Sequence, residues 1–409
     1  MSEPTVPRPD GWRNLTEFLA LRRNTTLLLV ALVLAGTGER LWLVFAPKYL
    51  QNLGAGVMVI GLFDGLQTLL GALYAYPGGW LTDRLGQRFS LTLFSCLSLA
   101  GFAIVLLWQH WLALVLGSFL FLAWSAFSLP ATFSVVATSL QQSRHTMGIG
   151  VQSMVRRVPM MVGPLAGGWL ITHFGWARGI HYALIGCIAL SFLTLLFQLG
   201  IAEPKSSSPA NTTVLNGGNF ISIVKSFTPA LKELLVSDIL IRFCERLPYA
   251  WVIVWAINRG GVSAQQYGVL VAIEMATAMV CYIPVAHLAD RYGRRPFVLV
   301  TFLFFTLFPL SLLWAGTFRG LAFAFMIRGL KEFGEPARKA LIIGEARPEL
   351  RARTYGAYYL IRDCVVTTGA FLGAWLWSLS PQANFLAAAI FGAAGTVWFW
   401  FFIFRRRAC

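Results

Sequence analysis

The sequence has few charged residues: Asp, Glu, Lys and Arg make up only 12% of its 409 residues. Soluble globular domains typically contain about 25% of these residues. Hydrophobic residues reach 57%, and the mean hydropathy is +0.66. These values exclude an ordinary soluble domain and indicate a protein that crosses a membrane several times.

Cysteine is also scarce, and the six cysteines show neither the paired spacing of a disulfide framework nor the clustering of metal ligands. The sequence contains no GxxxxGK[ST], HExxH or GxSxG motif, which argues against ATP-driven pumping and the common hydrolases. We therefore expect no disulfide, metal, cofactor or enzymatic activity. The polar first 24 residues lack a small-residue cleavage site, so we expect the first apolar stretch to stay in the protein.

Twelve stretches are long and apolar enough to cross a bilayer core of about 30 Å as helices. They are 26–50, 57–81, 90–108, 112–140, 147–174, 179–200, 231–257, 264–288, 296–316, 320–343, 354–378 and 384–404. A stretch rich in Ser, Pro, Asn and Gly separates the first six from the last six. We predict an all-α membrane protein with an N-terminal segment (1–25), a six-helix bundle (26–200), a cytoplasmic linker (201–230), a second six-helix bundle (231–404) and a basic tail (405–409).

The net charge of +16 would fit nucleic-acid binding if the basic residues formed one patch. Instead they concentrate in the segments expected on the inner side, and the outer loops hold only Lys48, Arg178, Arg259 and Arg319. This asymmetry follows the positive-inside rule. It predicts an integral protein of the inner or plasma membrane with both termini in the cytoplasm, and it gives no support for a nucleic-acid partner.

A charged motif occurs twice, as GWLTDRLGQR at 79–88 and as AHLADRYGRR at 286–295, each time at the end of an apolar stretch. Gly86 and Gly293 permit the tight turn that a hairpin needs here. We expect the two hairpins to form a cytoplasmic gate that locks the outward-facing state. The alternative is a topological anchor, because basic loops alone orient a membrane protein. The gate candidates are Gly79, Asp83, Arg84, Gly86, Arg88, Asp290, Arg291, Gly293 and Arg295.

The repeat extends beyond the hairpins. Glu39-Arg40-Leu41 corresponds to Glu245-Arg246-Leu247, and GPLAGGWL at 163–170 corresponds to GAFLGAWL at 369–376. Parallel repeats of six spans are typical of one large class of secondary transporters. The sequence therefore indicates two related bundles that move relative to each other.

These motifs resemble the major facilitator superfamily, and the resemblance covers nearly the whole chain. The pattern G-x-x-x-D-R-x-G-x-R is similar to its best-known motif and is present in both halves. The GPxxGG element formed by Gly163, Pro164, Gly167 and Gly168 resembles that of its proton-coupled drug antiporters. The resemblance implies twelve helices in two pseudo-symmetric bundles, alternating access, a small-molecule substrate and protons as a partner. Two departures are that the fourth span lacks the arginine of many antiporters, and that Gly36 occupies the first Glu position of the ExxER pattern of peptide carriers.

Small residues such as those of the GPxxGG element also let helices approach closely, so we expect these four residues to serve helix packing.

Glu39 and Arg40 lie near the middle of the first span, and Glu245 and Arg246 near the middle of the seventh. A charge at the bilayer centre costs about 2.5–3.5 kcal/mol, so such residues usually face a partner or a water-filled cavity. Our leading hypothesis is that Glu39 or Glu245 takes up a proton. The adjacent or opposing arginine then sets the pKa of that glutamate or binds the substrate. The alternative is a buried ion pair that only fixes packing.

The seventh and tenth spans carry further charges. Asp238, Arg242 and either Glu245 or Arg246 are spaced to form a charged ladder on one helix face. In the tenth span, RGLKEFGEPARK at 328–339, the spacing predicts i,i+4 pairs of Arg328 with Glu332 and of Lys331 with Glu335, before a kink at Pro336. This stretch either lines the transport path or seals the two halves together, and the sequence favours neither.

The fifth and eleventh spans hold Arg156-Arg157 and Arg362-Asp363. Arginine binds carboxylate or phosphate with two parallel hydrogen bonds, so these residues are candidates for holding an anionic group. The alternative is charge balance against Asp64, Glu274 or Asp363. The candidates for proton coupling and the substrate cavity are Glu39, Arg40, Glu245, Arg246, Arg242, Arg157, Arg328, Glu332, Glu335, Arg362 and Asp363.

The sequence thus predicts a secondary active transporter that moves a small organic molecule by alternating access in a lipid bilayer, coupled to protons and with export favoured. One alternative is proton-coupled uptake of an organic anion by Arg40, Arg246 and Arg157. Another is a non-transporting receptor or sensor with the same fold.

Overall fold

The computed structural model describes residues 23–124, 155–200, 220–345 and 351–405. Within these ranges every expected span coincides at least in part with a helix, and there is no strand. The helices of the first half are α2 (Arg23–Trp42), η1 (Leu43–Phe45), α3 (Ala46–Asn52), α4 (Val57–Leu85), α5 (Gln87–Leu107), an unlabelled helix Trp111–Trp124, and α8 (Arg157–Leu199). Those of the second half are α9 (Phe220–Lys225), α10 (Pro229–Arg246), α11 (Trp251–Asn258), α12 (Ala264–Tyr292), α13 (Arg294–Trp314), α14 (Phe318–Leu330), α15 (Glu335–Gly344), α16 (Arg351–Leu379), α17 (Pro381–Phe399) and η4 (Trp400–Phe404).

Local breaks divide several of these helices. Helix α8 consists of two expected spans joined at Gly175, whose φ of 78° interrupts the helical backbone. Helix α10 ends at Arg246 and α11 begins at Trp251, with Pro248 in the connecting turn. Four residues likewise separate the end of α14 at Leu330 from the start of α15 at Glu335. Pro336 occupies the first turn of α15. Each break exposes backbone polar groups that the surrounding bundle has to satisfy.

In the described part of the chain, six helices are long and apolar enough to cross a membrane by length and composition. They are Thr26–Asn52, Val57–Tyr74, Arg88–Leu107, Arg157–Leu199, Arg294–Trp314 and Pro381–Phe404. Of the other expected spans, 112–140 is described only over the apolar helix Trp111–Trp124. The rest are interrupted, as in α10/α11 and α14/α15, or carry buried charges, as in α12 and α16. A span that carries charges has to face other helices and not lipid.

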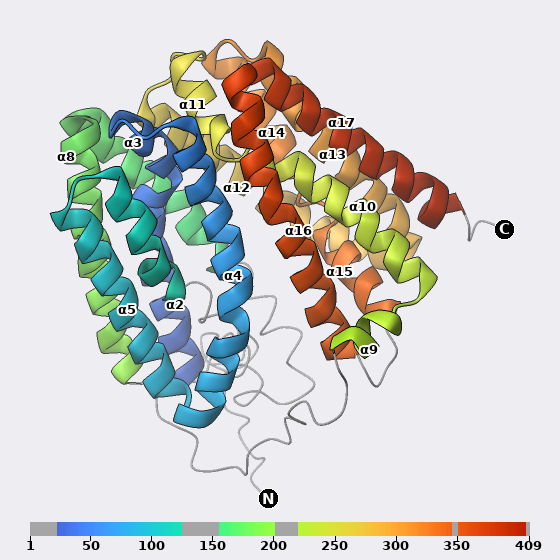
Figure 1. Cartoon of the computed structure of the whole chain (residues 1–409), viewed down its shortest axis with the longest axis horizontal. Coiled ribbons are helices and arrows are strands. Elements are labelled where there is room, and N and C mark those ends of the chain that lie inside the picture. Colours follow the sequence, from blue (N-terminus) through green and yellow to red (C-terminus); the bar gives the residue numbers. More distant parts are fainter. Residues whose placement is uncertain (1–22, 125–154, 201–219, 346–350, 406–409) are drawn as a thin grey trace, which may run out of the picture.

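The helices form two bundles (Figure 1). Helices α2, α4, α5 and α8 lie in one bundle, and α10 and α13 to α17 lie in the other. The bundles meet at the end that carries α3 and α11 and separate toward the end where α4 turns into α5. Across the junction, α8 packs against α12 and α4 packs against α16. The described helices of the two bundles therefore converge at one end, which we call the closed end, and diverge toward the other, which we call the open end.

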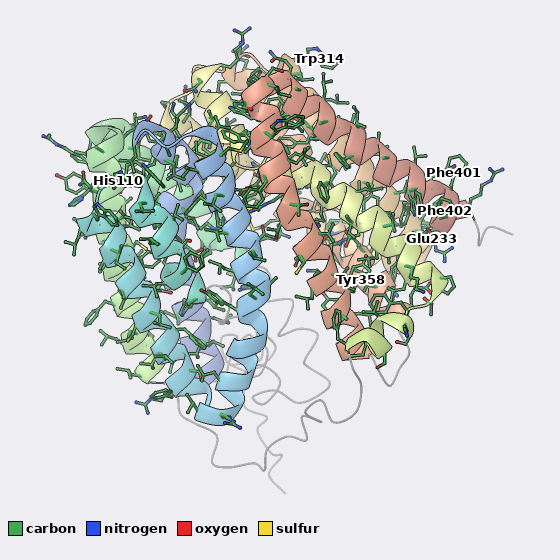
Figure 2. All side chains as sticks on the ribbon, in the orientation of Figure 1. His110, Glu233, Trp314, Tyr358, Phe401 and Phe402 are labelled. Atoms are coloured by element: carbon green, nitrogen blue, oxygen red, sulfur yellow. The ribbon has the colours of Figure 1, made fainter. Side chains whose placement is uncertain are left out.

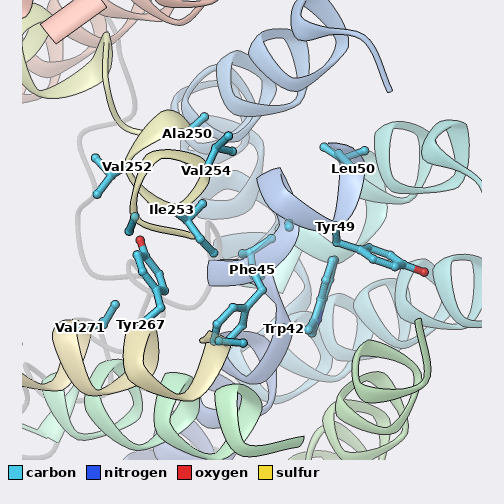
Figure 3. Packing of buried hydrophobic residues seen from close by; sticks show 14 of the residues in the cluster. Trp42, Phe45, Tyr49, Leu50, Ala250, Val252, Ile253, Val254, Tyr267 and Val271 are labelled. Atoms are coloured by element: carbon cyan, nitrogen blue, oxygen red, sulfur yellow. The ribbon is translucent and has the colours of Figure 1, made fainter. Parts of the chain in front are cut away.

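An apolar cluster from both halves fills the closed end (Figure 3). Phe45 of η1 lies beside Ile253 of α11 and Tyr267 of α12, and the ring centroids of Phe45 and Tyr267 are 6.1 Å apart. Polar contacts add to this closure, since the Lys48 ammonium donates to the side-chain oxygen of Asn258 at 2.7 Å. The backbone N–H of Gln265 also donates to the Thr172 hydroxyl at 3.0 Å.

Glycine allows the two halves to touch backbone to backbone at this end. A Cβ atom at Gly168 of α8 would collide with the carbonyl oxygen of Ala264, and one at Gly268 of α12 would collide with that of Pro164. Small residues at such positions permit close helix approach. We call this contact between α8 and α12 the glycine seam.

The two hairpins have the expected glycine geometry. Gly86 has a φ of 83° and Gly293 a φ of 88°, a region that glycine enters without strain. Each glycine links two long helices, α4 to α5 and α12 to α13. The repeated motif therefore places the same turn in both halves, as the sequence predicts.

Candidate functional site

A cavity of about 220 Å³ lies between the two halves. Its walls come from α2, η1, α3, α4 and α8 on one side and from α10, α11, α12, the Lys331 turn and α14 on the other. The lining residues are Arg40, Leu43, Val44, Pro47, Gln67, Met160, Glu245, Tyr249, Ile253, Tyr267, Val271, Glu274, Met275, Arg328 and Lys331. We call it the central cavity. A mostly apolar pocket with a few convergent polar groups is typical of a small-molecule site.

Two of the three cations in the central cavity are paired. Arg328 is 3.2 Å from the carboxylate of Glu274, and the ammonium of Lys331 is 2.5 Å from that of Glu245. Arg40 forms no ion pair with any residue that the structure describes. The lining thus carries one more positive than negative charge, and the extra charge belongs to Arg40.

Aromatic rings hold Arg328 in place. Its guanidinium carbon lies 5.3 Å from the ring centroid of Phe308, 5.5 Å from that of Phe325 and 5.8 Å from that of Tyr249. Such cation–π contacts are favourable where water is excluded. The guanidinium is therefore fixed by its surroundings as well as by Glu274.

The ion pairs expected within the tenth span are wrong. Because α14 ends at Leu330 and α15 begins at Glu335, Lys331 and Glu332 lie in a turn and not on a continuous helix face. Lys331 instead reaches Glu245 of α10, and Glu332 reaches Arg157 of α8. The i,i+4 rule applies only where the helix is unbroken.

A second group of charges lies inside the C-terminal bundle. Arg242 contacts Glu245 at 2.6 Å, Glu335 at 3.2 Å and Asp238 at 4.0 Å, so the ladder expected along α10 is confirmed. Arg338 forms ion pairs with Asp238 and Glu335. The fully buried Asp238 therefore has several basic partners, which is what a carboxylate in a low-dielectric interior requires.

The eleventh span completes this network. Arg362 of α16 lies 3.4 Å from Asp238 and 2.7 Å from Asp363, and the Tyr358 hydroxyl donates to Asp238 at 3.2 Å. Of the charge-balance partners expected for Arg362, only Asp363 is correct. Within the described part of the chain, each charge of this network has an opposite charge beside it, and the pairs connect α10, α15 and α16.

Two ion pairs connect the halves. Arg246 of α10 lies 3.0 Å from the carboxylate of Asp64 on α4 and also donates to the Asp64 backbone carbonyl. Arg157 of α8 lies 3.3 Å from Glu332. Arg246 and Arg157, which the sequence suggested as anion ligands, thus each have a carboxylate partner in the opposite half.

Glu39 is in a different environment from Glu245. It lines a small cavity of about 10 Å³ inside the N-terminal bundle, together with the buried hydroxyl groups of Ser95, Ser98, Ser191 and Thr194. This is room for about one water molecule. Glu39 forms no ion pair within the described ranges, although the charges of Arg40 and Arg156 act on it through space.

The structure therefore divides the candidates into separate groups. Arg40, Glu245 and Arg328 line the central cavity, whereas Arg242, Glu335, Arg362 and Asp363 belong to the network behind it. The candidate list omits four residues that have clear partners: Asp64, Glu274, Lys331 and Arg338. The sequence predicts Asp64 and Glu274 only as counter-charges for the fifth and eleventh spans. It predicts Lys331 only as a partner of Glu335. The signal for Arg338 is a charge inside an apolar span, which does not identify a partner.

The gate candidates lie at the open end. Arg84, Arg88 and Arg291 are exposed there, and Arg291 lies over the ring of Tyr292 at 5.5 Å. Arg295 lines a different cavity at the end of the C-terminal bundle. The side chains of Gly79, Asp83 and Asp290 lie outside the described residues.

The residues of the GPxxGG element contact both halves. Gly163 lies against Arg40, and Gly167 lies against the Leu41 carbonyl of α2. Gly168 and Pro164 belong to the glycine seam. A side chain at Gly163 or Gly167 would displace the segment of α2 that carries Arg40.

Comparisons with known proteins agree with this architecture. A family profile described as "Major Facilitator Superfamily" matches residues 28–258 and 249–408. The chain is 25% identical over 386 residues to "Multidrug resistance protein MdtG" of Enterobacter lignolyticus (strain SCF1), covering 90% of this chain and 88% of the relative. It is 23% identical over 393 residues to the protein of the same name from Klebsiella pneumoniae (strain 342), covering 92% of each.

Solved structures show the same fold at low sequence identity. A nucleoside transporter, NupG, superposes with a TM-score of 0.77 at 12% identity, covering 93% of this chain and 100% of that one. A bacterial homologue of the human lysosomal transporter Spinster, in an inward-facing and unoccupied conformation, gives a TM-score of 0.70 at 14% identity, with coverage of 96% and 95%.

Proposed function

Because the chain belongs to the major facilitator superfamily, we propose that it exports small organic molecules in exchange for protons. It is a membrane transporter and not an enzyme, and it has the superfamily's fold of helices in two bundles, consistent with twelve spans. The names of its curated relatives, multidrug resistance proteins, support export. In this proposal both termini lie in the cytoplasm, so the open end of the structure faces inward.

The observation that carries the proposal is a substrate-sized cavity shared by the two halves and closed at one end. A site between two bundles becomes accessible from the other side when the bundles rotate. Tyr249 and Tyr267 supply amphipathic rings, and Met160 and Met275 supply flexible thioether chains. Methionine adapts to ligands of different shape, which supports a broad substrate range.

We assign the proton to Glu39. Protonating Glu245 would leave Lys331 without its carboxylate in a buried site and would remove one of the three carboxylate partners of Arg242, which is unfavourable. Protonating Glu39 breaks no ion pair among the described residues. The nearby hydroxyls of Ser98 and Thr194 donate to backbone carbonyls, so their oxygens can accept from a protonated carboxyl group. Glu39 therefore changes its charge at much lower structural cost.

The neighbouring Arg40 links the proton to the substrate. Glu39 faces the small hydroxyl-lined cavity while Arg40 faces the central cavity. When Glu39 is ionised its charge offsets that of Arg40, and when it is protonated the central cavity becomes more positive. A cationic substrate is then released as the proton binds, which is the exchange required for export.

The same electrostatic coupling between Glu39 and Arg40 supports a second candidate function. Arg40 has no carboxylate partner in the described structure, and an anionic substrate would bind more tightly when Glu39 is protonated. That behaviour corresponds to proton-coupled uptake of an organic anion. The charge of the transported molecule distinguishes the two candidates.

The test uses the purified protein in proteoliposomes with an imposed pH gradient, with ethidium as a cationic probe and carboxyfluorescein as an anionic probe. We expect ethidium to move against the proton flow. Glu39→Gln, which has the charge of the protonated carboxyl group, should abolish gradient-driven movement and weaken ethidium binding. Glu233→Gln is the matched control, because Glu233 is a carboxylate that binds Trp398 away from the central cavity; we expect it to transport normally.

Three results would redirect the proposal. Gradient-driven movement retained in Glu39→Gln would remove the proton assignment. Carboxyfluorescein moving with protons, and ethidium not moving, would favour anion uptake. Binding of a probe without movement of either one would favour a receptor or sensor.

A further inference from the structure

A second sizeable cavity lies outside the proposed transport path. It has a volume of about 390 Å³ and sits at the end of the C-terminal bundle, where α10 and α13 begin and α15 and η4 end. Its lining consists of Thr228, Pro229, Ala230, Leu234, Arg295, Leu341, Glu345, Phe402 and Ile403. No residue of the central cavity takes part, so the two sites are separate.

This cavity, which we call the end cavity, has a polar rim and an apolar wall. Arg295 and Glu345 provide charges, while Leu234, Leu341 and Phe402 provide hydrocarbon surface. Exposed basic side chains adjoin the lining residues along the chain, namely Lys232, Arg294 and Arg405. The rim therefore carries an excess of positive charge.

Aromatic side chains place the end cavity at a membrane surface. Trp400 and Phe401 are exposed in η4, and Figure 2 shows Phe401, Phe402 and Glu233 at the same end of the C-terminal bundle. The Trp398 indole donates to the Glu233 carboxylate at 2.9 Å and ties the two helices together. Tryptophan and tyrosine typically mark the level of lipid head groups, and exposed aromatic side chains beside basic ones fit that level.

A local irregularity shapes the wall. Helix η4, Trp400–Phe404, which follows α17, is π-helical, and its Phe402 and Ile403 line the cavity while Trp400 and Phe401 are exposed. Single π-helical turns are uncommon and occur frequently at functional sites. The turn gives the cavity an apolar side facing the bundle and an aromatic edge facing the surroundings.

From these observations we infer that the end cavity binds an anionic phospholipid. The phosphate lies at the basic rim against Arg295, and the upper part of an acyl chain lies against Leu341, Phe402 and Ile403. Basic pockets between membrane helices bind such head groups through charge and shape. The lipid bridges α10, α13, α15 and η4, and it gives Arg295 of the repeated hairpin a role that its counterpart Arg88 does not share.

The test measures the melting temperature of the purified full-length protein in a neutral detergent. We expect added phosphatidylglycerol to raise it by roughly 2–4 °C or more, since a ligand that binds only the folded state stabilises it. Phosphatidylcholine with the same acyl chains should give little change. Arg295→Gln should lose the phosphatidylglycerol effect, whereas Arg88→Gln, the matched position of the other hairpin, should keep it.

A second variant separates loss of the lipid site from misfolding of the protein. Leu341→Trp fills the cavity without removing a charge, and we expect it to fold, to lose the phosphatidylglycerol shift and to release the anionic lipid that copurifies with the wild type in native mass spectrometry. An equal shift with inorganic phosphate would show a free-phosphate site and overturn the lipid assignment. An equal shift with phosphatidylcholine, or an equal loss in Arg88→Gln, would overturn it too. None of these outcomes depends on transport.

Discussion

The ion pair between Asp64 and Arg246 should hold the protein in its present state. The two residues come from opposite halves, and both side chains are largely buried, with exposed fractions of 3% and 13%. Rotation of the bundles about the closed end would separate α4 from α10 at this point. We therefore expect Asp64→Asn to shift the equilibrium away from the state that is open at the hairpin end.

The size of the shift follows from the contacts. Breaking a buried ion pair by removing one partner costs about 3–5 kcal/mol. Asparagine keeps the backbone carbonyl that also accepts from Arg246, so the lower value applies. A change of about 3 kcal/mol corresponds to roughly 150-fold in the ratio of the two states. The Arg157–Glu332 pair is more exposed, at 14% and 26%, and its loss should shift the ratio only about 5-fold.

Double electron–electron resonance, which measures the distance between two spin labels, checks this expectation. Spin labels at Phe89 and Tyr292, which are 54% and 64% exposed on the two hairpins, report the separation of the open end in a background without native cysteines. Asp64→Asn should shorten the distance between the two labels, because it favours the state in which the hairpin end is closed. The double variant Asp64→Arg with Arg246→Asp, which exchanges the two charges, should restore the long distance. An unchanged distance distribution in Asp64→Asn, or failure of the swap to restore it, would refute a state-specific pair.

Three further predictions concern stability and are checked by thermal or denaturant unfolding of the purified protein. Gly167→Ala should destabilise it by about 1–3 kcal/mol, because the new Cβ collides with the Leu41 carbonyl; wild-type stability would show that α2 moves freely at this point. Asn384→Leu should cost about 1–3 kcal/mol, because the buried amide donates to two backbone carbonyls, at 3.0 Å and 2.7 Å, that would lose their donor; no loss would mean that water replaces it. Glu245→Gln should cost about 3–5 kcal/mol, because Lys331 stays buried without its carboxylate, and a smaller loss than in Glu39→Gln would contradict the proton assignment.

Much of the architecture could be predicted from the sequence because it depends on local patterns. Hydropathy predicts the helices, and the repeated motif predicts the glycine turns at Gly86 and Gly293. The superfamily and the fold in two bundles are confirmed by the family match and the solved structures. The ladder in α10 is also correct, because Asp238, Arg242 and Glu245 lie on one unbroken helix.

The partners of the remaining charges could not be predicted, because they depend on helix ends and on packing between halves. Lys331 lies just after α14 ends, so its expected partner on the same helix is out of reach. Asp64 and Arg246 are far apart in the sequence, and no spacing rule connects them. The matched Glu-Arg pairs of the two halves even differ in their contacts, since Arg246 reaches the other half while Arg40 faces the central cavity.

The glycine seam has a consequence for the energetics of transport. Where backbone touches backbone, at Gly168 and Gly268, side chains contribute little to the contact between the halves. A rocking motion about this line changes little buried hydrocarbon at the seam itself, whereas opening the closed end separates the apolar cluster that holds Phe45, Ile253 and Tyr267. The hydrophobic cost of changing state therefore falls on that cluster and not on the pivot.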